Sequence, residues 1–316
     1  MITFAEPKKI INTDNLSKLE WLNYRQKGIG GSDISSICGI NPYKSSLALY
    51  YEKTEDIKEN EDENLPAEIG TYLEPFLRVK FDKWIKKNED PDIVVGVMSY
   101  ILQHPENEIA LANIDSFIDH PKRGRGGVEF KTTSERNWRD WEEDKLPDYY
   151  YLQCQWYMYV TGWDFWYLAF LIGNRKFGVK VIERNEEVID NIVKQANDFW
   201  NNFVIPKVPP APSGDESSEK TLARLYPKEE EGKTITLDVE KNIEVIENIN
   251  EEIKRLYTQL DTEKQSIKAV MKDAEIALCG DKKITWKEVV KKEYVVKASK
   301  YRMFKISNIN LNGGNK

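Results

Sequence analysis

Three charged residues, Asp115, Glu129 and Lys131, could together form a metal-dependent catalytic centre. Val128 and Phe130 alternate with Glu129 and Lys131. Because successive side chains on a strand point to opposite faces, the carboxylate and the ammonium share one face. Paired with Asp115, Glu129 would offer the oxygen ligands that Mg²⁺ prefers, and Lys131 would activate or orient a water molecule for phosphodiester hydrolysis. The alternative is the solvated face of an ordinary strand.

The segments around these residues predict two strands and a connecting loop. The apolar run Ile109–Ile114 ends at Asp115, and the residues 127–131 form the second strand. Between them, the residues 121–127 are rich in glycine and begin with proline, which is typical of a hairpin loop. If the two strands pair, Asp115 comes close to Glu129.

A glycine-rich segment near the N-terminus predicts a phosphate-binding site. Residues 14–27 are expected to be helical, and Ser32 is expected to cap a short helix over residues 34–39. A helix N-terminus with free N–H groups, a hydroxyl and the nearby Arg25 suits a phosphate group. The alternative is an ordinary capped helix without a ligand.

Residues 66–87 predict an amphipathic helix that carries a third acidic candidate, Glu74. A carboxylate beside the apolar stripe is unfavourable unless it is paired or binds a metal ion; alternatively, Glu74 faces solvent. Pro75 predicts a kink or a break in this helix. The expected stripe consists of Ile69, Leu73, Phe76, Leu77 and Trp84.

The segment after Lys131 predicts the rest of an α/β (α+β) core. A buried helix is expected over residues 148–162, where Gln153 and Gln155 interrupt an apolar surface and need hydrogen-bond partners. Two strands (163–172 and 176–182) and the amphipathic helix 185–203 follow. We therefore expect a central mixed β-sheet flanked by helices.

The C-terminal third predicts an appendage to this core. Residues 206–235 have the composition of a linker between a core of residues 1–205 and an arm of residues 236–316. Apolar residues spaced three or four apart over 236–277 indicate a helical hairpin or a short coiled coil. The strands expected over residues 284–286 and 294–306 suggest a basic β-hairpin, because residues 282–305 hold nine basic and two acidic residues. The arm serves either oligomerisation or DNA binding.

Composition limits the class of protein. The 316 residues carry a formal net charge of −7, which disfavours a protein that coats DNA non-specifically. The three cysteines form no CxxC motif, which favours a reducing cytoplasm and disfavours a zinc or iron–sulfur site. No apolar run approaches a membrane span, and no signal peptide is expected.

Four motifs, in order, resemble those of the phage lambda exonuclease and YqaJ-type viral recombinase group within the PD-(D/E)xK nuclease superfamily. The resemblance covers roughly residues 20–205. Its motifs are Trp21-x-x-x-Arg25 with Gly30-Gly31-Ser32, Gly70-x-x-x-Glu74, Asp115 followed by Glu129-x-Lys131 (with Ile114-Asp115 in place of Pro-Asp), and Gln153-x-Gln155-x-x-Met158-x-Val160-Thr161.

The resemblance implies a restriction-endonuclease-like core and a 5′-to-3′ exonuclease that acts on double-stranded DNA ends and leaves 3′ overhangs for recombination by single-strand annealing. It implies Mg²⁺, with Mn²⁺ as a substitute, as the cofactor. The implied metal ligands are Glu74, Asp115 and Glu129; Lys131 and Gln153 complete the catalytic set; and Arg25, Ser32 and, with a spacing that differs by one residue, Arg136 bind the 5′-phosphate.

The same resemblance implies a single-strand annealing protein as partner, a homo-oligomer in the form of a trimeric ring, and a phage or prophage origin in a bacterial cytoplasm. Two alternatives stay open. One is a PD-(D/E)xK endonuclease, which would cut covalently closed circles. The other is a non-catalytic DNA-binding scaffold, which would release no nucleotides.

Overall fold

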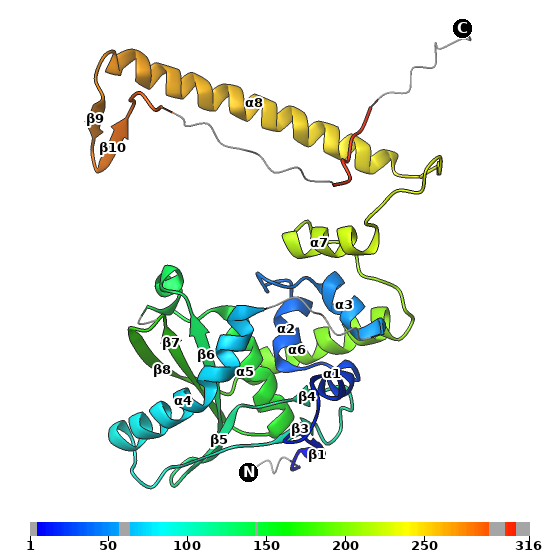
Figure 1. Cartoon of the computed structure of the whole chain (residues 1–316), viewed down its shortest axis with the longest axis vertical. Coiled ribbons are helices and arrows are strands. Elements are labelled where there is room, and N and C mark those ends of the chain that lie inside the picture. The colour runs from blue at the N-terminus through cyan, green and yellow to red at the C-terminus, as the bar shows by residue number, and fades with distance from the viewer. Residues whose placement is uncertain (1–4, 57–63, 143–144, 291–300, 308–316) are drawn as a thin grey trace. The chain divides into compact units, whose positions relative to one another are not determined.

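The computed structural model describes residues 5–56, 64–142, 145–290 and 301–307 (Figure 1). It divides into two units, Met1–Leu225 and Tyr226–Lys316, which are described separately below. The first unit contains both β-sheets of the core and most of the helices.

A five-stranded mixed sheet forms the centre of the first unit. Strands β6 and β7 run parallel, and the other neighbouring strands run antiparallel. This confirms the expected mixed sheet. In spatial order the strands are β2 (Val94–Gly96), β5 (Ser116–His120), β6 (Gly124–Thr133), β7 (Phe165–Ile172) and β8 (Lys176–Glu183).

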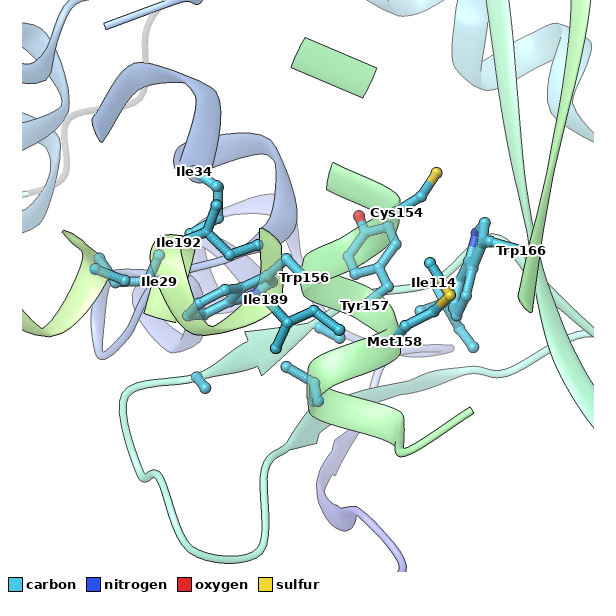
Figure 2. Packing of buried hydrophobic residues seen from close by; sticks show 14 of the residues in the cluster. Ile29, Ile34, Ile114, Cys154, Trp156, Tyr157, Met158, Trp166, Ile189 and Ile192 are labelled. Carbon is cyan, nitrogen blue, oxygen red and sulfur yellow. The ribbon is translucent and has the colours of Figure 1, made fainter. Parts of the chain in front are cut away.

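Helices cover both faces of this sheet. Both faces carry apolar side chains of the central strands, which the helices bury. Helix α4 (Leu65–Asn88) packs on the face that carries Val128, Phe130 and Tyr167. The opposite face carries Trp166, Leu168 and Phe170 and belongs to the core around helix α5 (Asp148–Thr161). Figure 2 shows this second core, where Tyr157 and Met158 lie close to Ile114 and Trp166, and Trp156 lies on the other side of the helix beside Ile189.

Helix α4 differs from its predicted pattern in two respects. It continues through Pro75 without a break. Its buried residues are Leu77, Phe81 and Ile85, whereas Ile69 and Phe76 are 43% and 54% exposed. The predicted stripe was therefore wrong in its first half. The α4 residues that are buried against the sheet all follow Pro75 and are spaced four residues apart.

Three short helices precede α4. Helix α1 (Lys18–Gln26) begins at Ser17, which forms a capping box with Glu20. Helix α2 (Gly31–Ile37) begins after Gly30, so the expectation that Ser32 caps it was wrong. The Asp33 carboxylate takes the reciprocal role by accepting the Gly30 N–H at 2.9 Å. Helix α3 (Ser46–Thr54) begins after Ser45, whose Oγ accepts the Ala48 N–H at 3.1 Å.

The predicted pairing of residues 109–114 with 127–131 was wrong. A small antiparallel sheet takes the first of these segments as β4 (Leu111–Ala112), beside β3 (Tyr100–Gln103) and β1 (Lys8–Asn12). The chain then passes to the large sheet, where β5 begins directly after Asp115 and pairs with β6. A local apolar pattern predicts a strand but does not identify its partner.

The first unit extends beyond the expected boundary at residue 205. Helix α6 (Glu186–Phe199) continues as a π-helical turn, Trp200–Val204. Helix α7 (Glu216–Leu225) lies within the segment predicted as a linker. Two contacts attach α7 to the core. Ser45 donates its N–H to Ser217 Oγ at 3.0 Å, and Arg224 pairs with Glu55 at 2.8 Å.

The second unit contains helix α8 (Glu240–Met271), a single uninterrupted helix, and a hairpin of β9 (Ile276–Cys279) and β10 (Lys282–Thr285). The hairpin therefore lies earlier in the chain than predicted. Of the strand expected over 294–306, residues 301–307 are irregular, and the part up to 300 lies outside the described residues. Among the helices in the described ranges, none is long and apolar enough to cross a membrane.

Candidate functional site

The register between β5 and β6 places Asp115 beside the Glu129-x-Lys131 motif of β6. Ser116 lies opposite Val128, so the next step of the same antiparallel register sets Asp115 beside Glu129. Asp115 Oδ2 accepts the backbone N–H of Phe130 at 2.8 Å. This hydrogen bond fixes the carboxylate to β6, between the two residues of the Glu-x-Lys motif. The expected proximity of Asp115 and Glu129 is thus found, although a different strand produces it.

Glu129 is buried on the α5 side of the sheet, with 3% of its surface exposed. Its Oε1 accepts hydrogen bonds from Lys131 Nζ at 2.5 Å and from Gln153 Nε2 at 2.7 Å. Its Oε2 has no hydrogen-bond partner among the described residues. A buried carboxylate oxygen without a donor is unfavourable, so this atom marks a place where a ligand would stabilise the structure.

The charges of the site are strongly coupled. Burial, together with the nearby charges of Glu129 and Glu74, raises the pKa of Asp115 well above its ordinary value. Burial by itself would lower the pKa of Lys131, but Glu129 and Asp115 raise it. The Lys131 ammonium also lies 4.8 Å from the centre of the Tyr150 ring.

The residues present fit a divalent cation. A carboxylate oxygen without a partner and two carboxylates that repel each other form a donor set that a hard cation such as Mg²⁺ would neutralise. Among the residues that the structure describes, however, no three His, Cys, Asp or Glu side chains already stand together as a metal-binding group. Asp115 and Glu129 are therefore the two ligands that this geometry supports.

Glu74 lies near this pair but is engaged with Arg78. The Arg78 guanidinium donates to Glu74 Oε1, to Ser116 Oγ at 2.7 Å and to the Asp115 carbonyl oxygen at 3.3 Å. Burial raises the pKa of Glu74, and the charge of Glu129 contributes to the rise. Arg78 thus links helix α4 to the start of β5, and the role of Glu74 as a third ligand stays a prediction.

The two glutamines of α5 have different surroundings. Gln153 donates from Nε2 to Glu129 and also to Tyr157 Oη at 2.9 Å. Gln155 instead donates to the Glu183 carbonyl oxygen at 2.8 Å and accepts the Asn185 N–H at 3.0 Å. Gln153 therefore lies in the site, whereas Gln155 satisfies the backbone at the end of β8.

Arg25 and Ser32, two of the three residues expected to bind a phosphate, lie together. Arg25 donates to Ser32 Oγ at 2.9 Å, and the guanidinium lies 4.8 Å from the centre of the Trp21 ring. Gly31 packs closely on α5, because a Cβ there would lie 2.6 Å from Tyr157 Cε1 and 3.1 Å from Gln153 Cγ. The start of α2, which carries Ser32, is thereby fixed beside the side chain that contacts Glu129.

A Gly31→Ala substitution is expected to destabilise the chain by about 1–3 kcal/mol, because the new methyl group overlaps the Tyr157 ring. The matched control is Gly70→Ala in α4, where a Cβ meets only Thr132 Oγ1 at 3.9 Å. Alanine there should stabilise the helix by about 0.5–1 kcal/mol. Urea unfolding of both variants measures the difference; equal stabilities would show that α2 and α5 are not in close contact.

Arg136 is not brought to these residues. It lies in the 3₁₀ helix η1 (Glu135–Trp141), where its backbone N–H donates to Ser134 Oγ at 3.1 Å and its side chain is exposed. Its assignment to the 5′-phosphate stays a prediction without support from this geometry.

Sequence reasoning missed several residues of the site. Arg78 follows Glu74 by four residues and Tyr157 follows Gln153 by four, a spacing that places both pairs on one side of a helix and could have indicated them. Tyr150 and Lys53 gave no comparable signal, because their contacts with Lys131 and Asp33 join different elements.

The fold and the site thus define an α/β protein with a mixed sheet and an acidic pair beside a partly buried lysine. Comparison with known proteins assigns it to a family. Residues 20–164 match the model of the YqaJ-like viral recombinase domain. The uncharacterized protein YqaJ of Bacillus subtilis strain 168 is 36% identical over 294 residues, which are 92% of this chain and 89% of that protein. The chain belongs to the YqaJ-like viral recombinase family.

Two solved structures also resemble the chain. An alkaline exonuclease from Laribacter hongkongensis is 17% identical with a TM-score of 0.48; the match covers 66% of this chain and 99% of that one. A phage-related exonuclease from Haemophilus somnus 129PT is 16% identical with a TM-score of 0.43, and the match covers 59% and 99%, respectively.

Proposed function

We propose that the chain is a metal-dependent nuclease that degrades double-stranded DNA from its ends in the 5′-to-3′ direction. The observation that carries this proposal is the meeting of Asp115, Glu129 and Lys131, with Glu129 Oε2 left without a partner among the described residues. Membership of the viral recombinase family supports the same class of substrate.

Asp115 and Glu129 would hold the cation, for which we propose Mg²⁺, with Mn²⁺ as a substitute. When bound, the ion supplies Lewis-acid stabilisation of the charge that develops on the phosphoryl oxygens. Lys131 places an ammonium beside the same position, where it orients the attacking water and attracts the scissile phosphodiester. Gln153 keeps Glu129 Oε1 in place through its amide N–H, and Tyr157 in turn holds Gln153.

Arg25 and Ser32 would bind the terminal 5′-phosphate of the strand being degraded. A guanidinium and a hydroxyl at the start of a helix suit a phosphate dianion, and the packing of Gly31 on α5 connects this position to Gln153. Recognition of the 5′ end on the same side of the protein as the acidic pair would give the reaction its polarity. The 3′-ended strand would then remain as a single-stranded overhang.

One assay tests this function against its alternatives. The chain is expected to release nucleotides from linear 5′-phosphorylated duplex DNA with Mg²⁺, to stop when EDTA removes the metal, and to leave a covalently closed circle intact. Cleavage of the closed circle would indicate an endonuclease. Absence of metal-dependent release from either substrate would reject a nuclease in favour of a DNA-binding scaffold.

We further propose that the enzyme works as a homo-oligomer, in a trimeric ring, beside a single-strand annealing protein in the cytoplasm of a bacterial host. Support comes from family membership and from the proposed product, since a 3′ overhang is the substrate that an annealing protein would need. Sedimentation of the full chain as a monomer would reject the ring.

A further inference from the structure

A buried ion pair lies beside the proposed phosphate site and takes no part in the chemistry described so far. Asp33 of α2 is 1% exposed, and the Lys53 side chain of α3 is 5% exposed. Lys53 Nζ lies 2.8 Å from Asp33 Oδ2 and also donates to the carbonyl oxygen of Arg25 at 3.0 Å. Because desolvation offsets much of the attraction in a buried pair, net stability alone is a weak reason for its presence.

The Asp33 carboxylate lies among three donors. Its Oδ2 accepts the Gly30 N–H and the Lys53 ammonium, and its Oδ1 lies 3.6 Å from the Arg25 guanidinium. Burial by itself would raise the pKa of Asp33, but the charges of Lys53 and Arg25 hold it far below its ordinary range. Asp33 is therefore ionised, and two cations share one anion.

The charge balance of this group favours anion binding. Arg25 and Lys53 contribute two positive charges and Asp33 one negative charge, while Lys44 nearby is paired with Glu52 at 2.7 Å. The group keeps one net positive charge. Of its three members, Arg25 is the most exposed, at 27% of its side chain, so the excess charge is presented to solvent there, next to Ser32.

We propose that Lys53 and Asp33 are positioning residues for the phosphate site: Asp33 orients Arg25, and Lys53 neutralises Asp33 so that the charge of Arg25 remains available to a phosphate. This rests on the proposed function, because the anion is taken to be the 5′-phosphate of a DNA end. Without Lys53, Asp33 would have Arg25 as its main countercharge, and the two would form a neutral pair. Without both Lys53 and Asp33, the charge of Arg25 would again be free.

The experiment compares the affinity of the full chain for a hairpin duplex that ends in a 5′-phosphate with its affinity for the same duplex with a 5′-hydroxyl. Fluorescence anisotropy in EDTA measures binding without cleavage. The wild-type chain is expected to prefer the phosphorylated end by about tenfold, the value of a hydrogen bond to a charged group. Lys53→Met should reduce this ratio to about one, and Asp33→Asn/Lys53→Met should restore most of it.

The double variant also serves if Lys53→Met alone fails to fold, because it leaves no unpaired buried charge. Lys86→Met is the matched control: Lys86 forms an exposed ion pair with Asp82 at 2.7 Å, and its loss should leave the ratio unchanged. A wild-type ratio in Lys53→Met, or a lost preference in the double variant, would overturn the proposal. Nucleotide release by the wild-type chain is measured separately, so a failed nuclease assay and a failed positioning role are distinguishable.

Discussion

A Lys131→Ala variant is expected to release nucleotides from linear duplex DNA about 10²–10⁴-fold more slowly than the wild-type chain. Lys131 is held by Glu129 Oε1 at 2.5 Å and by the Tyr150 ring, so its ammonium occupies one defined position beside the acidic pair. Alanine removes the group that would orient water and attract the phosphodiester. The measurement is the single-turnover rate of release from a 5′-phosphorylated duplex with Mg²⁺.

Two further variants make this result specific. Lys131→Arg keeps the charge but replaces a compact ammonium by a planar fork, so only partial activity is expected. Lys122→Ala removes a lysine that is 79% exposed and pairs with Asp90, and it should act like the wild-type chain. Thermal unfolding must show that Lys131→Ala is folded. A folded Lys131→Ala protein with full activity would contradict the proposed mechanism.

An Asp115→Asn variant is expected to lose activity and yet to be more stable than the wild-type chain in metal-free buffer at neutral pH. The structure places a partly buried carboxylate near Glu129 and Glu74, and burial together with these charges raises its pKa well above the ordinary value. Asparagine removes the repulsion and can still accept the Phe130 N–H. The expected gain is about 1 kcal/mol, which corresponds to about 2–4 °C in melting temperature for a unit of this size.

The pH dependence of this gain follows from linkage. Because the pKa of Asp115 is raised in the folded state, the folded chain binds this proton more tightly than the unfolded chain does. The contribution of Asp115 to stability therefore falls as the pH rises above its ordinary pKa of 3.8, until the folded-state pKa is passed. The two melting temperatures should converge at acidic pH. An equal difference at every pH would show that the charge of Asp115 is not its source.

Metal ions should reverse the order of stability. A ligand at one hundred times its dissociation constant stabilises the folded chain by about 2.7 kcal/mol, so Mg²⁺ or Mn²⁺ should raise the melting temperature of the wild-type chain and have little effect on Asp115→Asn. Asp119→Asn is the matched control, because Asp119 follows Asp115 by four residues on β5, and its half-exposed side chain pairs with Arg125. Equal shifts in all three proteins would remove Asp115 from the list of metal ligands.

The local pattern of the sequence was sufficient to predict which faces of β6 its side chains occupy. Alternation with a period of two placed Val128 and Phe130 on one face and Glu129 and Lys131 on the other, and the structure shows this arrangement, with the charged pair on the α5 side. The same kind of reasoning identified the mixed sheet and helix α5. Side-chain periodicity depends only on backbone geometry, so it can be read from neighbouring residues.

Partners across the fold could not be obtained in this way. The chain pairs β5 rather than residues 109–114 with β6, selects Gln153 rather than Gln155 for Glu129, and buries Asp33 against Lys53. Each of these choices joins different helices or strands, or depends on what packs against a helix face. The sequence alone determined which residues could do the chemistry. Only the tertiary structure decided which of them meet, because burial and charge pairing depend on long-range packing that no local spacing specifies.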